Sequence, residues 1–288
     1  MIDYTLIKSK ANRKGVIVMI PGFAHTKQHY LETPDKRAGW AYNFSELGYD
    51  VYAINWPGIK NNFPFKNNEI DSENIISGIS NFIKDEIKEK VILLTHSAAG
   101  IFGWKLAELL PEVRTVVGIA PGGPGNIQPI PDIKQISNSE VEVIYNTIPY
   151  RFDFNKSWEP TDFWIHNKLI GASKFFPTEN YKEYKESLIS VPSKVLYERM
   201  NINGSQIKID QNKIKEYGTK IFIFTGTEDI DHSKDTDNSI NDWFLKNSIK
   251  SEFHWLGDEG FVGNGHMIML EKNSMKIAEH ISKIIETS

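Results

Sequence analysis

The 288-residue sequence contains no cysteine, little net charge and no long apolar run. Without cysteine the chain forms no disulfides, thiolate nucleophiles, zinc sites with thiolate ligands or cysteine-ligated iron–sulfur clusters. Its 33 basic and 37 acidic residues leave a formal net charge of −4. Proteins that bind nucleic acid or anionic membranes usually carry a basic patch or stripe, and this charge balance gives no sign of one. We therefore expect neither partner.

Apolar segments are short compared with the roughly 20 residues that a membrane-spanning helix needs. Segments such as 15–20 and 91–94 have the length of buried strands. The N-terminal stretch MIDYTLIKSKANRKG contains Asp3 and lacks the apolar run of a secretory signal. The composition, with 40% hydrophobic and 24% charged residues, is typical of a globular enzyme. These features predict a cytoplasmic protein.

Short β-rich runs alternate with longer helical segments along most of the chain. Strands are expected at 16–20, 51–54, 91–94, 114–120, 220–225 and 251–256, and helices at 36–47, 70–88, 97–110, 239–246 and 274–285. Continuously apolar strands joined by helices indicate an α/β fold with a mostly parallel central sheet flanked by helices. Ligands of such sheets bind at the carboxyl ends of the strands.

Residues 122–218 break this alternation and are rich in aromatic side chains. A structureless loop of that length is implausible inside a compact domain. We therefore expect an inserted, mostly helical cap at 122–218, on a core made of residues 1–121 and 219–288. Some of the aromatic side chains would line an apolar pocket, while most would form the small core of the cap itself.

A serine stands where a predicted strand passes directly into a predicted helix. Residues 91–104 read VILLTHSAAGIFGW, with Ser97 at the turn. This is the arrangement of a nucleophile elbow, whose tight turn needs small residues two before and two after the serine. Those positions hold Thr95 and Ala99, and Thr95 is bulkier than the usual glycine. The alternative is that Ser97 only caps the helix.

A nucleophilic serine needs a base and a group that orients the base. Of the eight histidines, His266 lies in the glycine loop GNGHM, where a flexible turn can bring its imidazole over Ser97. The preferred acid is Asp229, just after a strand, with Glu228 and Asp231 as competitors. The chain order Ser97, Asp229, His266 is the order expected after such an elbow. A purely structural role in the loop is the alternative for His266.

An oxyanion hole needs two backbone N–H groups near the serine. One is expected from Ala98, the residue after Ser97. The other is expected from the loop PGFAH after the strand at 16–20, where Phe23 is weakly favoured over Ala24. Gly22 would allow the backbone to turn sharply there.

Four further residues are candidate substrate contacts: His25, Tyr30, Trp56 and Trp158. Packing under a loop is the alternative for Trp56. His25 and His29 are spaced four apart, as in some metal sites, but the stretch HTKQH follows Pro-Gly in a loop and itself contains no acidic ligand. We therefore expect neither a metal ion nor an organic cofactor.

Together these elements resemble the α/β-hydrolase fold over nearly the whole chain. Residues 21–58 are also similar to a branch of bacterial esterases in which a T-P-D-G-R-x-G-W stretch follows an H-G-G-G-x-T-G oxyanion loop. Residues 33–40 read TPDKRAGW, and the stretch GHMIMLEKN around His266 matches as well.

Three departures from that branch stand out. Pro21, Phe23 and Ala24 make the oxyanion loop stiffer and more apolar, and Asn55 replaces an aspartate at a strand end. The stretch 118–122, where some members of the branch carry the triad acid, has no carboxylate. The last departure supports an acid at the more usual position, after the strand at 220–225.

The resemblance implies a serine hydrolase that cleaves a small to medium, partly apolar carboxylic ester through an acyl-enzyme. Lactonase, amidase and acyltransferase reactions use the same triad and remain open. The alternative from another class is a ligand-binding protein with the same fold and only vestigial turnover.

Overall fold

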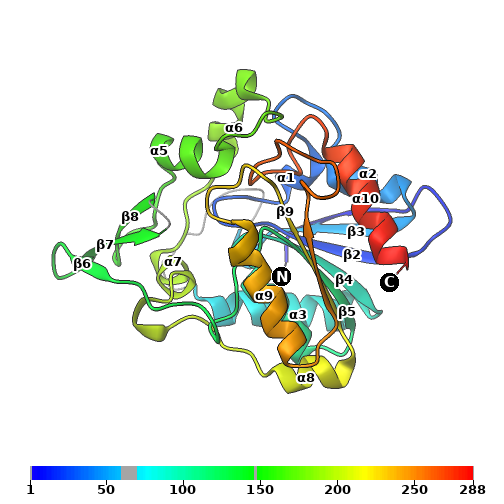
Figure 1. The fold of residues 1–288 in the computed structure, drawn as a ribbon, viewed down its shortest axis with the longest axis horizontal. Helices are drawn as coiled ribbons and strands as arrows, with labels where there is room; N and C mark the ends of the chain where they lie inside the picture. Colours follow the sequence, from blue (N-terminus) through cyan, green and yellow to red (C-terminus); the bar gives the residue numbers. More distant parts are fainter. Residues whose placement is uncertain (1, 60–69, 146–147, 288) are drawn as a thin grey trace.

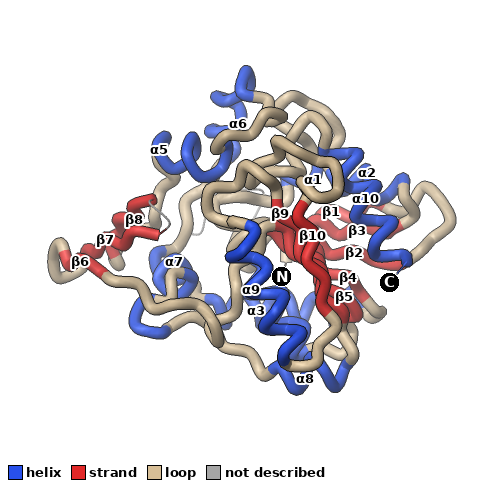
Figure 2. Tube along the Cα trace, in the orientation of Figure 1, coloured by secondary structure: helices blue, strands red, loops and turns tan. Residues whose placement is uncertain are grey.

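The computed structural model describes residues 2–59, 70–145 and 148–287. Its centre is a seven-stranded sheet in the order β1-β3-β2-β4-β5-β9-β10 (Figures 1 and 2). The strands are Tyr4–Ile7 (β1), Gly15–Ile20 (β2), Tyr49–Ile54 (β3), Val91–His96 (β4), Val113–Ile119 (β5), Lys220–Thr225 (β9) and Ser251–Trp255 (β10). Among the described strands of this sheet, only β1 pairs antiparallel, with β3. The predicted mostly parallel α/β sheet is confirmed.

Helices cover both faces of this sheet (Figure 1). On one face, α2 (Trp40–Glu46) packs against α10 (Ser274–Thr287), and the Trp40 indole N–H donates to the Ser274 carbonyl at 3.0 Å. On the other face lie α3 (Ser72–Phe82), α4 (Ala99–Leu109) and α9 (Lys234–Lys246). There Trp104 of α4 meets Phe244 of α9, with 5.2 Å between the ring centres. The strands between these layers bury continuous apolar runs, as predicted.

Two helix starts differ from the prediction for local reasons. The helix expected from residue 36 begins only at Trp40, because Thr33 holds a turn with the Arg37 backbone and Lys36 adopts a φ of 65°. Helix α9 begins earlier than expected, at Lys234, because the Ser233 side chain caps it by accepting the Thr236 N–H. The α3 helix continues as a π-helical turn, Ile83–Ile87.

The segment 122–218, which we call the insertion, leaves the sheet after β5 and returns at β9. It contains an antiparallel sheet of β6 (Ile133–Gln135), β7 (Glu140–Tyr145) and β8 (Ile148–Asp153), set apart from the central sheet in Figure 2. The expectation of a mostly helical segment missed this sheet. Its signal is the alternation in residues 140–143, where Val141 and Val143 are buried and the two glutamates between and before them are not.

The rest of the insertion is built from short helices, joined by irregular segments. These are α5 (Asp162–Trp164), a π-helical turn (Ile165–Ile170), two 3₁₀ turns (Thr178–Asn180 and Ile202–Gly204), α6 (Tyr181–Ser187), α7 (Ser193–Arg199) and α8 (Gln211–Tyr217). A four-residue helix, α1 (Gln28–Leu31), lies in the core after β2. Within the described ranges, every helix is too short or too polar to cross a bilayer.

Candidate active site

Ser97 occupies the sharp turn between β4 and α4. Its φ of 53° lies in the left-handed region, which non-glycine residues rarely adopt. Three backbone hydrogen bonds hold this conformation: the Ser97 N–H donates to Ile119, and its carbonyl accepts from Gly100 and Gly122, each at 2.9 Å. The turn therefore has the strained geometry expected of a nucleophile elbow.

Thr95, which stands where an elbow usually has glycine, is accommodated by Gly103 of α4. A Cβ atom on Gly103 would lie only 2.8 Å from the Thr95 Cγ2 methyl. A Cβ on Gly100 would lie 2.6 Å from the Pro121 Cβ, so α4 approaches the end of β5 closely there too. Gly103 thus compensates for the larger residue in the strand, and Gly100 lets the start of α4 lie close to the end of β5.

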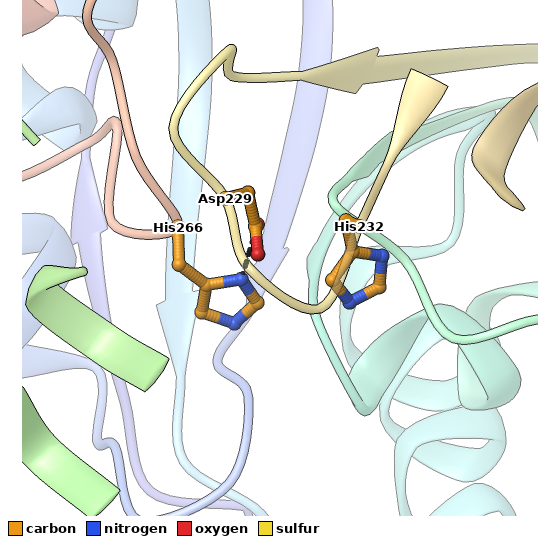
Figure 3. A group of neighbouring side chains, drawn as sticks. All are labelled: Asp229, His232 and His266. Carbon is orange, nitrogen blue, oxygen red and sulfur yellow. Dashed lines mark hydrogen bonds and ion pairs between the residues drawn. The ribbon is translucent and has the colours of Figure 1, made fainter. Parts of the chain in front are cut away.

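His266 and Asp229 form a hydrogen-bonded pair, and His266 lines the same cavity as Ser97. The His266 Nδ1 is 2.5 Å from the Asp229 Oδ2 (Figure 3), and the Asp229 Oδ1 accepts the Asp231 N–H at 3.0 Å. The other ring nitrogen of His266, Nε2, has no hydrogen-bond partner among the described residues. Ser97 and His266 both line the cavity. The structure therefore leaves this nitrogen available to accept a proton.

Burial sets the charge states of this pair. It lowers the pKa of His266 to about 4, against the opposing charge of Asp229. Burial also opposes ionisation of Asp229, but the neighbouring His266 and His232 and the hydrogen bond from His266 lower its pKa to about 2. At neutral pH the pair is therefore a neutral imidazole hydrogen-bonded to a carboxylate.

Asp231 and Glu228, the two other candidate acids, form contacts with residues other than His266. The buried Asp231 forms an ion pair with Lys168 of the insertion. Glu228 is only partly buried, and its carboxylate accepts the Thr227 hydroxyl at 3.2 Å. Geometry therefore favours Asp229 over both as the partner of His266.

A buried carboxylate, Glu271, holds the loop that carries His266. It accepts the Gly265 N–H at 2.7 Å, the Ser173 hydroxyl at 2.5 Å and the Asn264 amide. Burial raises the pKa of Glu271. Because Ser173 belongs to the insertion, this one carboxylate connects the insertion to the histidine loop.

The stretch 33–40 fastens the far end of the same loop. Arg37 pairs with Asp35 at 2.7 Å and donates to the carbonyls of Leu270 and Glu271 at 3.0 and 3.1 Å. The two stretches that carry the resemblance to bacterial esterases are thus in direct contact. Membership of that particular branch stays a prediction.

The loop after β2 approaches Ser97 through Gly22, where a Cβ would lie 3.0 Å from the Ser97 Cβ. The His25 N–H donates to the Gly22 carbonyl at 3.3 Å, and Ala24 adopts a φ of 61°. The Gly22 carbonyl and the Phe23 N–H belong to one peptide group and point in opposite directions. Because the carbonyl points toward His25, the Phe23 N–H points away from His25. In the described part of the chain, neither the Phe23 nor the Ala98 N–H donates a hydrogen bond.

The insertion holds this loop by three hydrogen bonds. The His25 Nε2 bonds the Tyr184 hydroxyl at 2.8 Å, and the His29 Nε2 bonds the Ser187 hydroxyl at 2.9 Å. The Ala24 carbonyl accepts the N–H of Ile189 at 3.0 Å. Burial lowers the pKa of His25 well below its usual value and that of His29 to about 4. Both rings are therefore neutral hydrogen-bonding groups.

Seven insertion residues close the cavity over Ser97: Tyr150, Trp164, Lys168, Leu169, Leu196, Arg199 and Met200. The remaining volume is about 20 Å³, which is room for about one water molecule. Two of the aromatic residues expected to line the pocket, Tyr150 and Trp164, do so. Others, such as Phe152 and Phe176, pack in the core of the insertion.

Of the four predicted substrate contacts, only His25 lines the cavity. The Tyr30 hydroxyl donates to the Ile20 carbonyl at 3.1 Å, and the Trp56 indole donates to the Pro21 carbonyl at 2.8 Å. The ring of Trp158 packs behind Trp164, at 4.9 Å between centres. Tyr30, Trp56 and Trp158 are each buried behind the lining, so the structure does not bring them to the cavity, and their role as substrate contacts stays a prediction.

Several residues of the site were not predicted. His96 lines the cavity, and its Nε2–H donates to the His266 carbonyl at 3.1 Å. Lys168 and Arg199 reach the cavity from the insertion. No local motif marks these two residues, because only the three-dimensional path of the insertion brings them over Ser97.

Asp229, His232 and His266 form the group of described residues that could ligate a metal ion, with ligand atoms within 4.8 Å of one another (Figure 3). Hydrogen bonds already occupy one atom of each residue. The His232 Nδ1 bonds Asp237 at 2.9 Å, and the other two residues bond each other. This arrangement fits a hydrogen-bonded acid–base pair with a second histidine stacked beside it, at 5.3 Å between ring centres.

Comparison with known proteins places these features in context. Residues 15–164 match a family model described as alpha/beta hydrolase fold. The probable secreted lipase phiG of Fungal sp. (strain ATCC 74256) is 23% identical over 91% of this chain and 79% of that protein. The Paleococcus ferrophilus monoacylglycerol lipase has a TM-score of 0.63 at 16% identity, covering 100% of this chain and 99% of that one. MenH from S. aureus has a TM-score of 0.63 at 13% identity, covering 99% and 98%. At these identities the solved structures support the fold alone.

Proposed function

The chain belongs to the alpha/beta hydrolase fold family, and we propose that it is a serine hydrolase that cleaves a carboxylic ester. One observation carries the proposal: His266, hydrogen-bonded to Asp229, shares a closed cavity with the strained Ser97. The lipase similarity supports an ester over other acyl substrates.

In this mechanism His266 Nε2 takes the Ser97 proton as the serine Oγ attacks the ester carbonyl. Asp229 keeps the proton of the imidazole on Nδ1 and stabilises the imidazolium that forms. His266 then donates its new proton to the leaving alcohol. In the second half-reaction it removes a proton from water, which attacks the acyl-enzyme and releases the acid.

The developing oxyanion would be bound by the N–H groups of Phe23 and Ala98, with Ala24 as the less favoured donor. Support comes from the turn that directs the Phe23 N–H away from His25 and from the Ala98 position at the start of α4. Preorganised backbone donors of this kind are each worth about 3 kcal/mol of barrier.

We assign residues 122–218 the role of a cap over the core of residues 1–121 and 219–288. The cavity holds about 20 Å³, far below the roughly 300 Å³ of a typical ligand site. An ester therefore enters only when the insertion shifts away from Ser97. No step in this mechanism requires a metal ion or an organic cofactor.

The test is steady-state hydrolysis of p-nitrophenyl acetate and butyrate. Ser97→Ala should lower kcat at least 10³-fold, and Asp229→Asn about 10³- to 10⁴-fold, because the triad acts as a unit. Ser77→Ala, on the exposed face of α3, is the matched control and should behave as wild type. Matching lactones, amides and acyl acceptors would then sort the related reactions. Ester binding without turnover in the wild type would support a ligand-binding protein instead.

A further inference from the structure

A short segment of the insertion lies against both loops that carry the proposed catalytic pair. Residues 168–175, which we call the brace, begin inside the π-helical turn Ile165–Ile170. Single turns of π-helix are often found at functional sites. One end of the brace contacts the loop that carries Asp229, and the other end contacts the loop that carries His266.

The first residues of the brace are anchored on the loop after β9. The Lys168 ammonium pairs with the Asp231 carboxylate, and both side chains are buried. The Asp231 N–H in turn donates to the Asp229 Oδ1 at 3.0 Å. A Cβ atom on Gly171 would lie 3.1 Å from the Glu228 carbonyl oxygen, so the backbone of the brace passes close to the same loop. These contacts fix the brace relative to the acid of the pair.

The last residues of the brace pack on the loop that carries His266. The Lys174 N–H donates to the Gly263 carbonyl at 2.9 Å. A Cβ atom on Gly265 would lie 3.0 Å from the Ser173 Cβ, so only glycine allows this approach. The brace therefore connects the acid loop to the histidine loop.

A polar contact links the brace to the residue before His266. The Ser173 hydroxyl donates to the Glu271 Oε1 at 2.5 Å, and the same oxygen accepts the Gly265 N–H at 2.7 Å. Glu271 is fully buried, so a lost donor leaves its carboxylate less well satisfied. Because Gly265 adjoins His266, a shift of this carboxylate would be passed on to the imidazole.

We propose that Ser173 is a positioning residue, which acts through Glu271 to hold the His266 imidazole where it bonds Asp229 and shares the cavity with Ser97. The inference rests on the proposed function and adds a role for the insertion beyond covering the site. A misplacement of about 1 Å can lower a catalysed rate about 100-fold. The described lining of the cavity does not include Ser173, so we expect its hydroxyl to affect the rate of reaction and not the binding of the ester.

The kinetic test compares Ser173→Ala with wild type on p-nitrophenyl butyrate. We expect kcat to fall about 10-fold and KM to change less than about twofold, because the change misplaces the base and leaves the cavity lining intact. Ser193→Ala is the matched control. Ser193 is a buried serine of the insertion whose hydroxyl donates to the Asp153 carbonyl at 2.9 Å, within the insertion itself. This control should leave kcat and KM unchanged.

A second measurement follows the imidazole itself and needs no ester. The ¹⁵N resonances of His266 in histidine-labelled protein, identified by their loss in His266→Gln, show which ring nitrogen carries the proton. In the wild type we expect the proton on Nδ1 alone, because the hydrogen bond to Asp229 holds it there. In Ser173→Ala the Nδ1–H and Nε2–H forms should be mixed, and Ser193→Ala should keep the wild-type pattern.

The two measurements separate this inference from the proposed function. If the wild type hydrolyses the ester, an unchanged kcat in Ser173→Ala, or a lower kcat with an unchanged His266 tautomer, would overturn the inference and leave the hydrolase standing. If the wild type hydrolyses no ester, the proposed function fails and the tautomer alone decides. A mixed tautomer in Ser173→Ala would then support the positioning role, and an unchanged one would overturn it.

Discussion

Three non-glycine residues with left-handed backbones follow three neighbouring strands at their carboxyl ends. They are Ala24 after β2, Ser97 after β4 and Ala120 after β5, with φ values of 61°, 53° and 43°. Each such conformation costs about 1 kcal/mol or more and persists only where surrounding contacts enforce it. Backbone strain often gathers at functional sites, so this grouping supports the proposed site independently of the side chains.

The pH dependence of kcat/KM tests the state of His266. Only the neutral imidazole can take the Ser97 proton, so activity falls as the pH drops through the pKa of His266. Because burial lowers that pKa to about 4, we expect kcat/KM on a neutral ester to stay level from pH 8 to about pH 5 and to fall below it. Enzyme kept at pH 7.5 and diluted into each assay buffer gives initial rates before unfolding. An acid limb near pH 6.5 would contradict this assignment.

The sequence could predict Ser97, Asp229 and His266 because each follows a recognisable strand or lies in a glycine loop. It could not predict Lys168 or Arg199, since their position depends on how the insertion folds over the core. It also could not show that Tyr30, Trp56 and Trp158 lie behind the cavity lining and not in it. An aromatic residue near a strand end is as easily packed behind a site as within it, and the sequence does not show which layer it occupies.

At the scale of elements, the contact of β4 with α4 shows how this chain departs from the usual glycine before the nucleophile. Thr95 keeps its methyl group because Gly103 leaves space for it. The effect on stability of a substitution at Thr95 in β4 therefore depends on the residue at position 103 in α4.

We expect Gly103→Ala to destabilise the protein, because overpacking costs about 1–3 kcal/mol. The higher helix propensity of alanine offsets roughly 1 kcal/mol of that cost. Adding Thr95→Ser removes the clashing methyl, so the double variant should be more stable than the sum of the single changes by about 1 kcal/mol. Urea unfolding measures each free energy. Thr219→Ser, at a buried threonine between α8 and β9, should combine additively with Gly103→Ala. Additivity in the Thr95 pair as well would refute the compensation.

The core strands were predictable because they are short, continuously apolar runs, whereas helix ends were not. The start of α2 depends on the Thr33–Arg37 turn, and the start of α9 on the Ser233 cap. The sheet β6–β8 was missed because its strands are short and lie within a segment without the core's strand–helix rhythm.

At the scale of the whole molecule, four histidines around the site are buried. His25, His29, His96 and His266 are each at most 5% exposed. Burial is the largest cause of the lowered pKa of each of them. Two of the four connect the core to the insertion, so the closed arrangement depends on neutral rings.

This set predicts loss of stability in mild acid. In the unfolded chain the histidines take up protons near pH 6.5, while the folded protein resists this until about pH 4 for His29 and His266. The free energy of unfolding should therefore fall as the pH drops from about 7 toward 4, by about 2 kcal/mol at pH 5 for each of His29 and His266. Urea titrations between pH 7.5 and 5 measure the slope. His29→Gln should reduce it and His166→Gln, at an exposed ring, should not. A flat profile would contradict the prediction.

The cellular location stays a prediction at this scale. The sequence favours a cytoplasmic protein, while the fungal relative is a probable secreted lipase. The fold and the site are compatible with either location, because neither uses a disulfide.

The most direct test of the central claim is intact-mass analysis after treatment with a fluorophosphonate, which reacts with activated serines. We predict one adduct per chain on the wild type, none on Ser97→Ala, and an unchanged adduct on the control variant Ser77→Ala. Absence of an adduct on folded wild-type protein, or an adduct that persists in Ser97→Ala, would contradict the assignment of Ser97 as the nucleophile.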